Sequence, residues 1–97
     1  MYRVIDKRDS GKTKKLLEEC AKNHGVFVCR HPNNVRDKCE AYGIKYFDIV
    51  DVLGYEDYLI KDDYDNLNPK IYIDELELFT QYCVHGRLGG YSLTEED

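Results

Sequence analysis

Apolar residues along this chain occur in short runs that alternate with longer stretches of helical spacing. The short runs, at residues 2–5, 26–29, 46–52 and 70–73, are typical of strands in a sheet that is covered on both faces. Between and after them, apolar side chains recur on one helix face: Leu16, Leu17 and Cys20; Val35, Cys39 and Tyr42; Leu76, Phe79 and Cys83. The pattern therefore predicts alternating strands and helices.

Two weaker elements complete this pattern. Residues 54–60 are expected to form one or two helical turns before a polar surface loop, and residues 91–93 a very short last strand. Alternating strands and helices favour a parallel sheet with right-handed crossovers and with helices on both faces. Because 97 residues can bury one small core, we expect a single α/β domain over residues 1–97, with three layers and a small, mostly parallel sheet of four or five strands.

Charge is distributed unevenly along the sequence. Residues 1–45 contain 11 Lys and Arg against 6 Asp and Glu, a net charge of +5, whereas residues 46–97 contain 3 against 13, a net charge of −10. A basic first half suits an anionic ligand such as phosphate, and an acidic second half suits a cation or a basic partner surface, although both halves also fit ordinary solvated faces. The overall charge of −5 argues against direct nucleic-acid binding.

Cysteine and histidine spacing gives no signal for a metal site or a disulfide framework. The four cysteines form no CxxC pair and the three histidines complete no zinc-binding spacing, so we expect reduced thiols in or near the core. No apolar run approaches the length of a membrane span, and the N-terminal residues lack the apolar stretch of a signal peptide. These features predict a cytoplasmic protein that does not enter a membrane.

The tripeptide Gly11-Lys12-Thr13 follows the first predicted strand and opens the first predicted helix. In the phosphate-binding motif GxxxxGK[ST], backbone N–H groups converge on phosphate oxygens, the lysine neutralises the outer phosphates and the hydroxyl holds Mg²⁺. Asp6 stands where the first glycine of the motif belongs, which restricts the backbone and adds negative charge near the phosphates. The tripeptide alone is weak evidence for a phosphate site. Its position between a predicted strand and a predicted helix is what favours one.

A second segment, KIYIDE at residues 70–75, has the form of the strand that carries a magnesium-associated carboxylate. In such strands the acidic residue at the C-terminal end, here Asp74, holds a metal-bound water, and the adjacent Glu75 can polarise an attacking water as general base. Both motifs come at strand ends and in the expected order. Together they favour a nucleotide site that contains Mg²⁺.

Around the first motif, KRDSGKT followed by LLEECAKNHGVFVC resembles the phosphate-loop (P-loop) NTPases encoded by phages. Their Walker A loop is often deviant, as in large terminase ATPases, with no first glycine and with an arginine three residues before the final glycine, where this chain has Arg8. The resemblance covers nearly the whole chain, through the Walker B-like YIDELE to GYSL. It implies ATP or another nucleoside triphosphate as ligand, Ser10, Gly11, Lys12 and Thr13 as its binding residues, Mg²⁺ between Thr13 and Asp74, and Glu75 and Arg8 as catalytic residues.

Two departures limit what this resemblance implies. Asp9 places a second carboxylate in the loop, and the 22 residues after Glu75 leave little room for a further strand or a substrate domain. Arg8 also fits an ordinary solvated loop charge.

Three functions therefore remain open. The first is a P-loop-like domain that binds ATP or another nucleoside triphosphate, with weak or partner-dependent hydrolysis. The second is an inactive pseudo-NTPase that acts as a small acidic interaction or inhibitor protein, for example a phage anti-defence or anti-CRISPR-type protein in the host cytoplasm. The third is a structural accessory of a phage ATPase or packaging complex. In the second, the acidic half would present tyrosines to a protein partner, and it contains Tyr46, Tyr55, Tyr58, Tyr64 and Tyr72 among its carboxylates.

Overall fold

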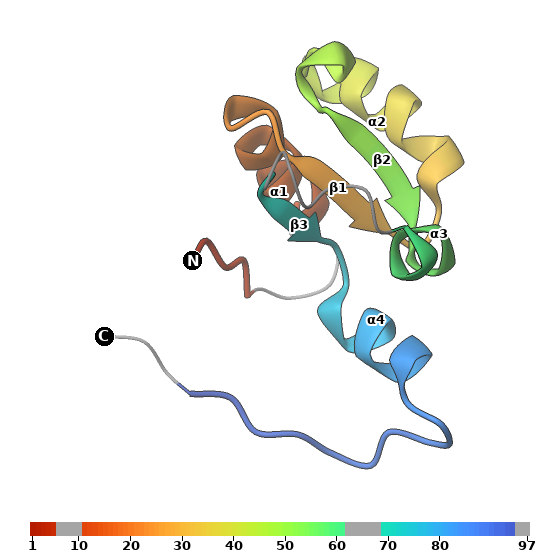
Figure 1. The fold of residues 1–97 in the computed structure, drawn as a ribbon. Coiled ribbons are helices and arrows are strands. Elements are labelled where there is room, and N and C mark those ends of the chain that lie inside the picture. Colours follow the sequence, from red (N-terminus) through yellow and green to blue (C-terminus); the bar gives the residue numbers. More distant parts are fainter. Residues whose placement is uncertain (6–10, 62–68, 95–97) are drawn as a thin grey trace.

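The structure, a computed structural model, describes residues 1–5, 11–61 and 69–94. Helices and strands alternate along these segments in the order α1 (Lys12–Lys22), β1 (Val26–Cys29), α2 (Val35–Tyr42), β2 (Asp51–Gly54), α3 (Tyr55–Ile60), β3 (Ile71–Ile73) and α4 (Leu76–Cys83). Short 3-10 turns, Pro32–Asn34 and Tyr46–Asp48, precede α2 and β2. Figure 1 shows the sheet packed between helices, and the chain after α4 running away from the rest of the domain.

The strands of the described segments form one parallel sheet in the order β2–β1–β3. The central strand β1 pairs with β2 along its whole length and with β3 over three residues. All of its residues are buried, which accounts for its unbroken apolar sequence. The predicted α/β class with a parallel sheet is confirmed. The predicted number of four or five strands is wrong for the described residues, which contain three.

One face of the sheet is covered by α1 and α2, and this face contains the larger core. Leu17 of α1 and Cys39 of α2 are fully buried in the same cluster as Phe27 of β1. Cys29 belongs to this cluster too, because residues two apart on a strand point to the same face. Burial of a large apolar side chain stabilises a fold by about 1.5–3 kcal/mol, so this layer supplies much of the stability of a small domain.

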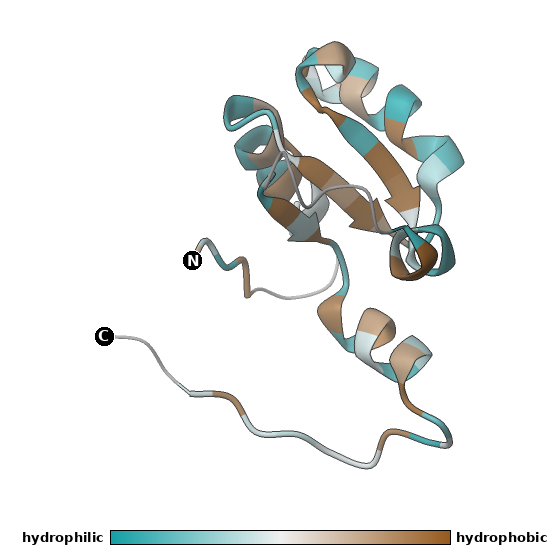
Figure 2. Ribbon diagram, viewed as in Figure 1, coloured by the Kyte–Doolittle hydropathy of each residue, from teal (hydrophilic) through white to brown (hydrophobic). Residues whose placement is uncertain are grey.

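The opposite face of the sheet is covered less completely, by α3 and α4. Val26 and Val28 form a second cluster with Tyr55 of α3, and Phe79 of α4 meets the Tyr55 ring edge-on at a centroid distance of 5.3 Å. No residue of α4 is buried, although Figure 2 shows that the helix is largely apolar. Several large apolar side chains of α3 and α4 are therefore exposed: Leu59, Ile60, Leu76, Leu78 and Tyr82.

Two predicted strands, residues 2–5 and 91–93, are absent from the sheet. The side chains of Tyr2 and Ile5 are 45% and 76% exposed, so this segment buries too little apolar surface to hold a strand in place. Tyr91 and Leu93 are exposed as well, in the part of the chain that leaves the domain after α4. The strand expected to precede the GKT tripeptide and α1 is therefore not formed by the described residues, although the helix itself is.

The third predicted strand begins later than expected. The N–H of Ile49 donates to the carbonyl oxygen of Tyr46 at 3.1 Å, and this i to i+3 bond makes residues 46–48 a 3-10 turn. Strand pairing starts only at Asp51. Alternation of apolar residues across this segment thus reflects a turn packed on the core followed by a strand.

Candidate functional site

The first turn of α1 lies at the carboxyl edge of the sheet and begins at a left-handed glycine. Gly11 has φ 83° and ψ 22°, a region that glycine adopts at little cost. Its carbonyl accepts the N–H of Lys15 at 3.1 Å, so the N–H groups of Lys12 and Thr13 lie in the first turn, where a helix provides no acceptor. No acidic residue occupies this turn. The helix end therefore presents partial positive charge to an anion.

A hydrogen bond joins the two sequence motifs. The hydroxyl Oγ1 of Thr13 donates to Oδ2 of Asp74 at 3.0 Å, across 61 positions of sequence. Asp74 follows β3 directly, and its own N–H donates to the carbonyl of Val28 at 2.9 Å, which continues the pairing with β1 by one residue. The sheet thus fixes the backbone of Asp74, and α1 fixes its side chain.

The environment of the Asp74 carboxyl opposes its ionisation. Burial raises its pKa above the ordinary value, and the neighbouring Glu75 carboxylate raises it further. The Thr13 hydroxyl, Lys38 and Lys12 act in the opposite direction. A cation bound here would add to the positive charge near this half-buried carboxylate and favour its ionised form.

Lys38 was not predicted to belong to the site. It projects from α2 and is half-buried, and it acts electrostatically on both Asp74 and the Cys29 thiol. One sequence signal was present, because Lys38 stands beside Cys39 and three positions after Val35, at the border of the buried face of α2. The site therefore has two lysines from two helices near one carboxylate.

Glu75 has an unusual backbone conformation. Its φ of 56° lies in the left-handed region, which costs a residue with a Cβ of the order of 1–2 kcal/mol. Its carbonyl accepts the N–H groups of Leu78 and Phe79 at the start of α4, at 3.0 and 3.1 Å. The Tyr55 hydroxyl donates to the carbonyl oxygens of Asp74 at 2.8 Å and Glu75 at 3.3 Å. Tyr55, which the sequence placed on a partner surface and not at this site, therefore holds this strained turn, and the Glu75 side chain is exposed.

The Cys29 thiol, next to this site, is not expected to be reactive. Cys29 ends β1 and is buried, and desolvation together with the charge of Asp74 raises its pKa to about 11. Since the thiolate is the reactive form, Cys29 acts as an apolar wall of the site. All four cysteines are free thiols, of which Cys83 is exposed.

The predicted site residues fall into two groups. Gly11, Lys12, Thr13, Asp74 and Glu75 lie at the same edge of the sheet, and Thr13 bonds Asp74 directly. The other two, Arg8 and Ser10, lie outside the described residues, as do the loop carboxylates Asp6 and Asp9.

The donors at this edge fit Mg²⁺ in kind and number. Among the described residues no three His, Cys, Asp or Glu side chains come together as a metal-binding group. Thr13 and Asp74 instead offer one hydroxyl and one carboxylate, both hard oxygen donors. Mg²⁺ commonly uses one or two protein oxygens, with substrate phosphates and waters as its other ligands. The pair therefore suits a metal that arrives with a phosphate ligand.

Comparisons with family models, with curated proteins and with solved structures found no match to this chain. In the described part of the chain, no helix is both long and apolar enough to cross a bilayer.

Proposed function

We propose that this protein binds a nucleoside triphosphate with Mg²⁺ at the first turn of α1. The observation that carries the proposal is the hydrogen bond from Thr13 to Asp74, because it brings the hydroxyl of the GKT motif to the carboxylate of the IDE motif. Two residues that recur together in phosphate and magnesium sites thus meet at the edge where ligands bind in parallel sheets.

The charges near this pair suit a polyphosphate. The N–H groups of the first turn of α1 and the ammonium groups of Lys12 and Lys38 place positive charge near Asp74 on this edge of the sheet. Mg²⁺ held by Thr13 and Asp74 would supply charge neutralisation for the phosphate oxygens. The finer prediction of a P-loop-like domain, with a deviant loop before Gly11, belongs to this proposal.

Hydrolysis is proposed to be weak or dependent on a partner. Glu75, the candidate general base, follows Asp74 on an exposed turn whose backbone Tyr55 fixes. An exposed side chain is not held in one position against an attacking water, and general-base catalysis needs such positioning. A partner that covered this turn would exclude water and strengthen its electrostatic interactions.

A second candidate function is a small acidic interaction protein without catalysis, and the exposed apolar side chains of α3 and α4 favour it. The prediction of which tyrosines form the partner surface needs correction. Tyr55 and Tyr72 are buried at 6% and 8% exposure because they pack on the sheet, and Tyr64 lies outside the described residues. Tyr82 and Tyr91 are exposed instead.

Calorimetric titration with Mg-ATP tests the proposal. Lys12→Ala should lower the affinity by more than about tenfold, or ~1.4 kcal/mol, since the ammonium opposes phosphate charge. Lys22→Ala removes the same charge from the other end of α1, and its effect should stay below about twofold. Equal losses in the two variants would show diffuse electrostatic attraction. No heat of binding in the wild type, with Mg-ATP or Mg-GTP, would leave the interaction protein as the better proposal.

A further inference from the structure

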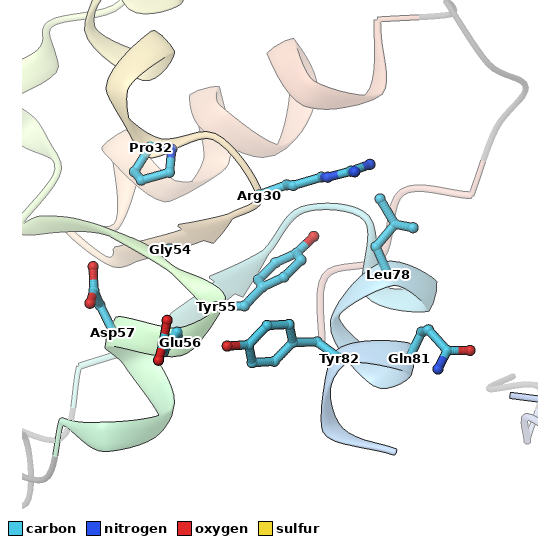
Figure 3. Close-up of a pocket in the computed structure, with 9 residues that line it drawn as sticks. All are labelled: Arg30, Pro32, Gly54, Tyr55, Glu56, Asp57, Leu78, Gln81 and Tyr82. Atoms are coloured by element: carbon cyan, nitrogen blue, oxygen red, sulfur yellow. The ribbon is translucent and has the colours of Figure 1, made fainter. Parts of the chain in front are cut away.

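A second feature of the carboxyl edge is an open pocket of about 530 Å³ on the α3 and α4 side of the sheet. Arg30, which follows β1, and Gly54, the last residue of β2, line it where these strands end, and α3 and α4 form its walls (Figure 3). Pockets for small ligands usually measure roughly 300–1,000 Å³. The volume is thus suited to a ring system with part of a sugar.

Tyr55 connects this pocket to the proposed phosphate site. Its ring lines the pocket, and its hydroxyl donates to the carbonyl of Asp74, the residue whose carboxylate accepts the Thr13 hydroxyl. The side chain of Tyr55 therefore lines the pocket and also contacts Asp74, the candidate magnesium ligand. A single ligand that spanned the two places would carry a phosphate end and a ring end.

The wall formed by α4 offers an aromatic surface. Figure 3 shows Tyr82 and Tyr55 facing the pocket from α4 and α3. Their ring centroids are 6.1 Å apart with an interplanar angle of 58°, and Tyr82 is 49% exposed, so part of its ring is accessible to a ligand. Planar aromatic ligands such as nucleobases stack on surfaces of this kind.

The charged groups of the pocket distinguish between ligand classes. Glu56 and Asp57 line it from the first turn of α3, and Arg30 lines it from the end of β1. Two carboxylates repel a phosphate or carboxylate ligand but accept hydrogen bonds from ring N–H and amino groups, while Arg30 can donate to a ring nitrogen or carbonyl. The edge of a purine base carries donors and acceptors together.

We propose that this pocket holds the base of the nucleotide whose phosphates bind at α1, an inference that rests on the proposed function. Gly54 provides a way to close the pocket without disturbing the fold. Its φ of −73° and ψ of 168° are open to any residue, and a Cβ there would lie 3.6 Å from Cγ of Pro32 in ordinary contact. The branches of a valine at this position would project from the lining of the pocket and reduce the space for the base.

The experiment compares Mg-ATP with Mg-tripolyphosphate, which has the phosphates without the base, by calorimetry on the wild type and three variants. Tyr82→Ala and Gly54→Val should each weaken Mg-ATP binding by about fivefold or more, because stacking or space for the base is lost. Both should leave the affinity for Mg-tripolyphosphate within about twofold. Tyr91→Ala, which removes an exposed tyrosine remote from the pocket lining, should change neither affinity.

The outcomes separate the two proposals. If the wild type binds Mg-tripolyphosphate as tightly as Mg-ATP, or if the pocket variants weaken both probes equally or neither, the base pocket is overturned and the phosphate site stands. If neither Mg-ATP nor Mg-tripolyphosphate binds, the proposed function fails and the base pocket fails with it.

Discussion

The hydrogen bond from Thr13 to Asp74 ties α1 to the end of β3, and its removal should lower the stability of the ligand-free protein. Thr13→Val keeps the branched shape of the side chain and removes only the hydroxyl. Hydrogen bonds to charged groups contribute about 1.5–3 kcal/mol when well buried. Both residues are only half-buried and the bond measures 3.0 Å, so we expect a value at or just below the lower end of this range, about 1–1.5 kcal/mol.

Urea unfolding followed by circular dichroism measures this loss. For a small domain the free energy falls by about 1–3 kcal/mol per molar urea, so the midpoint for Thr13→Val should move down by roughly 0.5–1 M without a change of slope. Thr13→Ser keeps a hydroxyl at the same place and should recover most of the loss. A matched fall in both variants would contradict this, because Thr13→Ser keeps the hydroxyl and the loss would then not depend on the hydrogen bond alone.

A double-mutant cycle decides whether Asp74 is the partner that matters. In an Asp74→Ala background the Thr13→Val substitution has no acceptor to lose and should be nearly neutral, which gives a coupling free energy of about 1 kcal/mol. If the two substitutions add within about 0.3–0.5 kcal/mol, the bond contributes nothing measurable and the reasoning is refuted.

Three further outcomes follow from other parts of the structure. Because burial raises the Asp74 pKa, the native state holds the carboxyl proton more tightly than the unfolded chain, and the stability from this group is lost as pH rises through the folded pKa. In urea titrations Asp74→Asn should therefore be stabilising at neutral pH, by an amount that disappears below the ordinary pKa of 3.8. Gly25→Ala should cost about 1–3 kcal/mol in thermal unfolding, because its Cβ would lie 2.6 Å from Cε2 of Tyr72, whereas Gly89→Ala meets nothing within 4 Å and should be neutral. A thiol-specific reagent should label Cys83 alone in the native protein and all four cysteines after denaturation, and rapid native labelling of a second thiol would contradict the burial.

The sequence predicted the central strand well and the outer segments poorly, for a physical reason. A strand buried on both faces must be apolar throughout, so Val26–Cys29 is recognisable without knowledge of its neighbours. Residues 2–5 have a similar composition, but whether such a segment joins the sheet depends on apolar surface and hydrogen-bond partners that other parts of the chain must provide. In the structure its side chains are mostly exposed.

The candidate site was predictable where it depends on the ends of elements. Strands of a parallel sheet end at one edge, so a hydroxyl in the first turn of α1 and an acid after β3 were expected to approach each other. Thr13 and Asp74 do so. Lys38 and Tyr55 were not predicted, because they reach the site through the packing of α2 and α3 on opposite faces of the sheet, which no local pattern specifies.

The end of β3 is also where the fold and the proposed ligand compete for the same groups. β3 has only three residues in the sheet, and two side chains from opposite faces bond the residue that follows it: Thr13 of α1 through the Asp74 carboxylate, and Tyr55 of α3 through the Asp74 carbonyl. A magnesium ion held by Thr13 and Asp74 would replace the first bond and leave the second intact. Binding must therefore return more free energy than the Thr13 bond contributes. The observed dissociation constant already includes the loss of the Thr13 bond, so a ligand at 100 times that constant adds about 2.7 kcal/mol of apparent stability net of the bond. The Tyr55 bond would hold the end of β3 in place during such an exchange, so the proposed ligand would bind at this edge without loss of the strand that forms it.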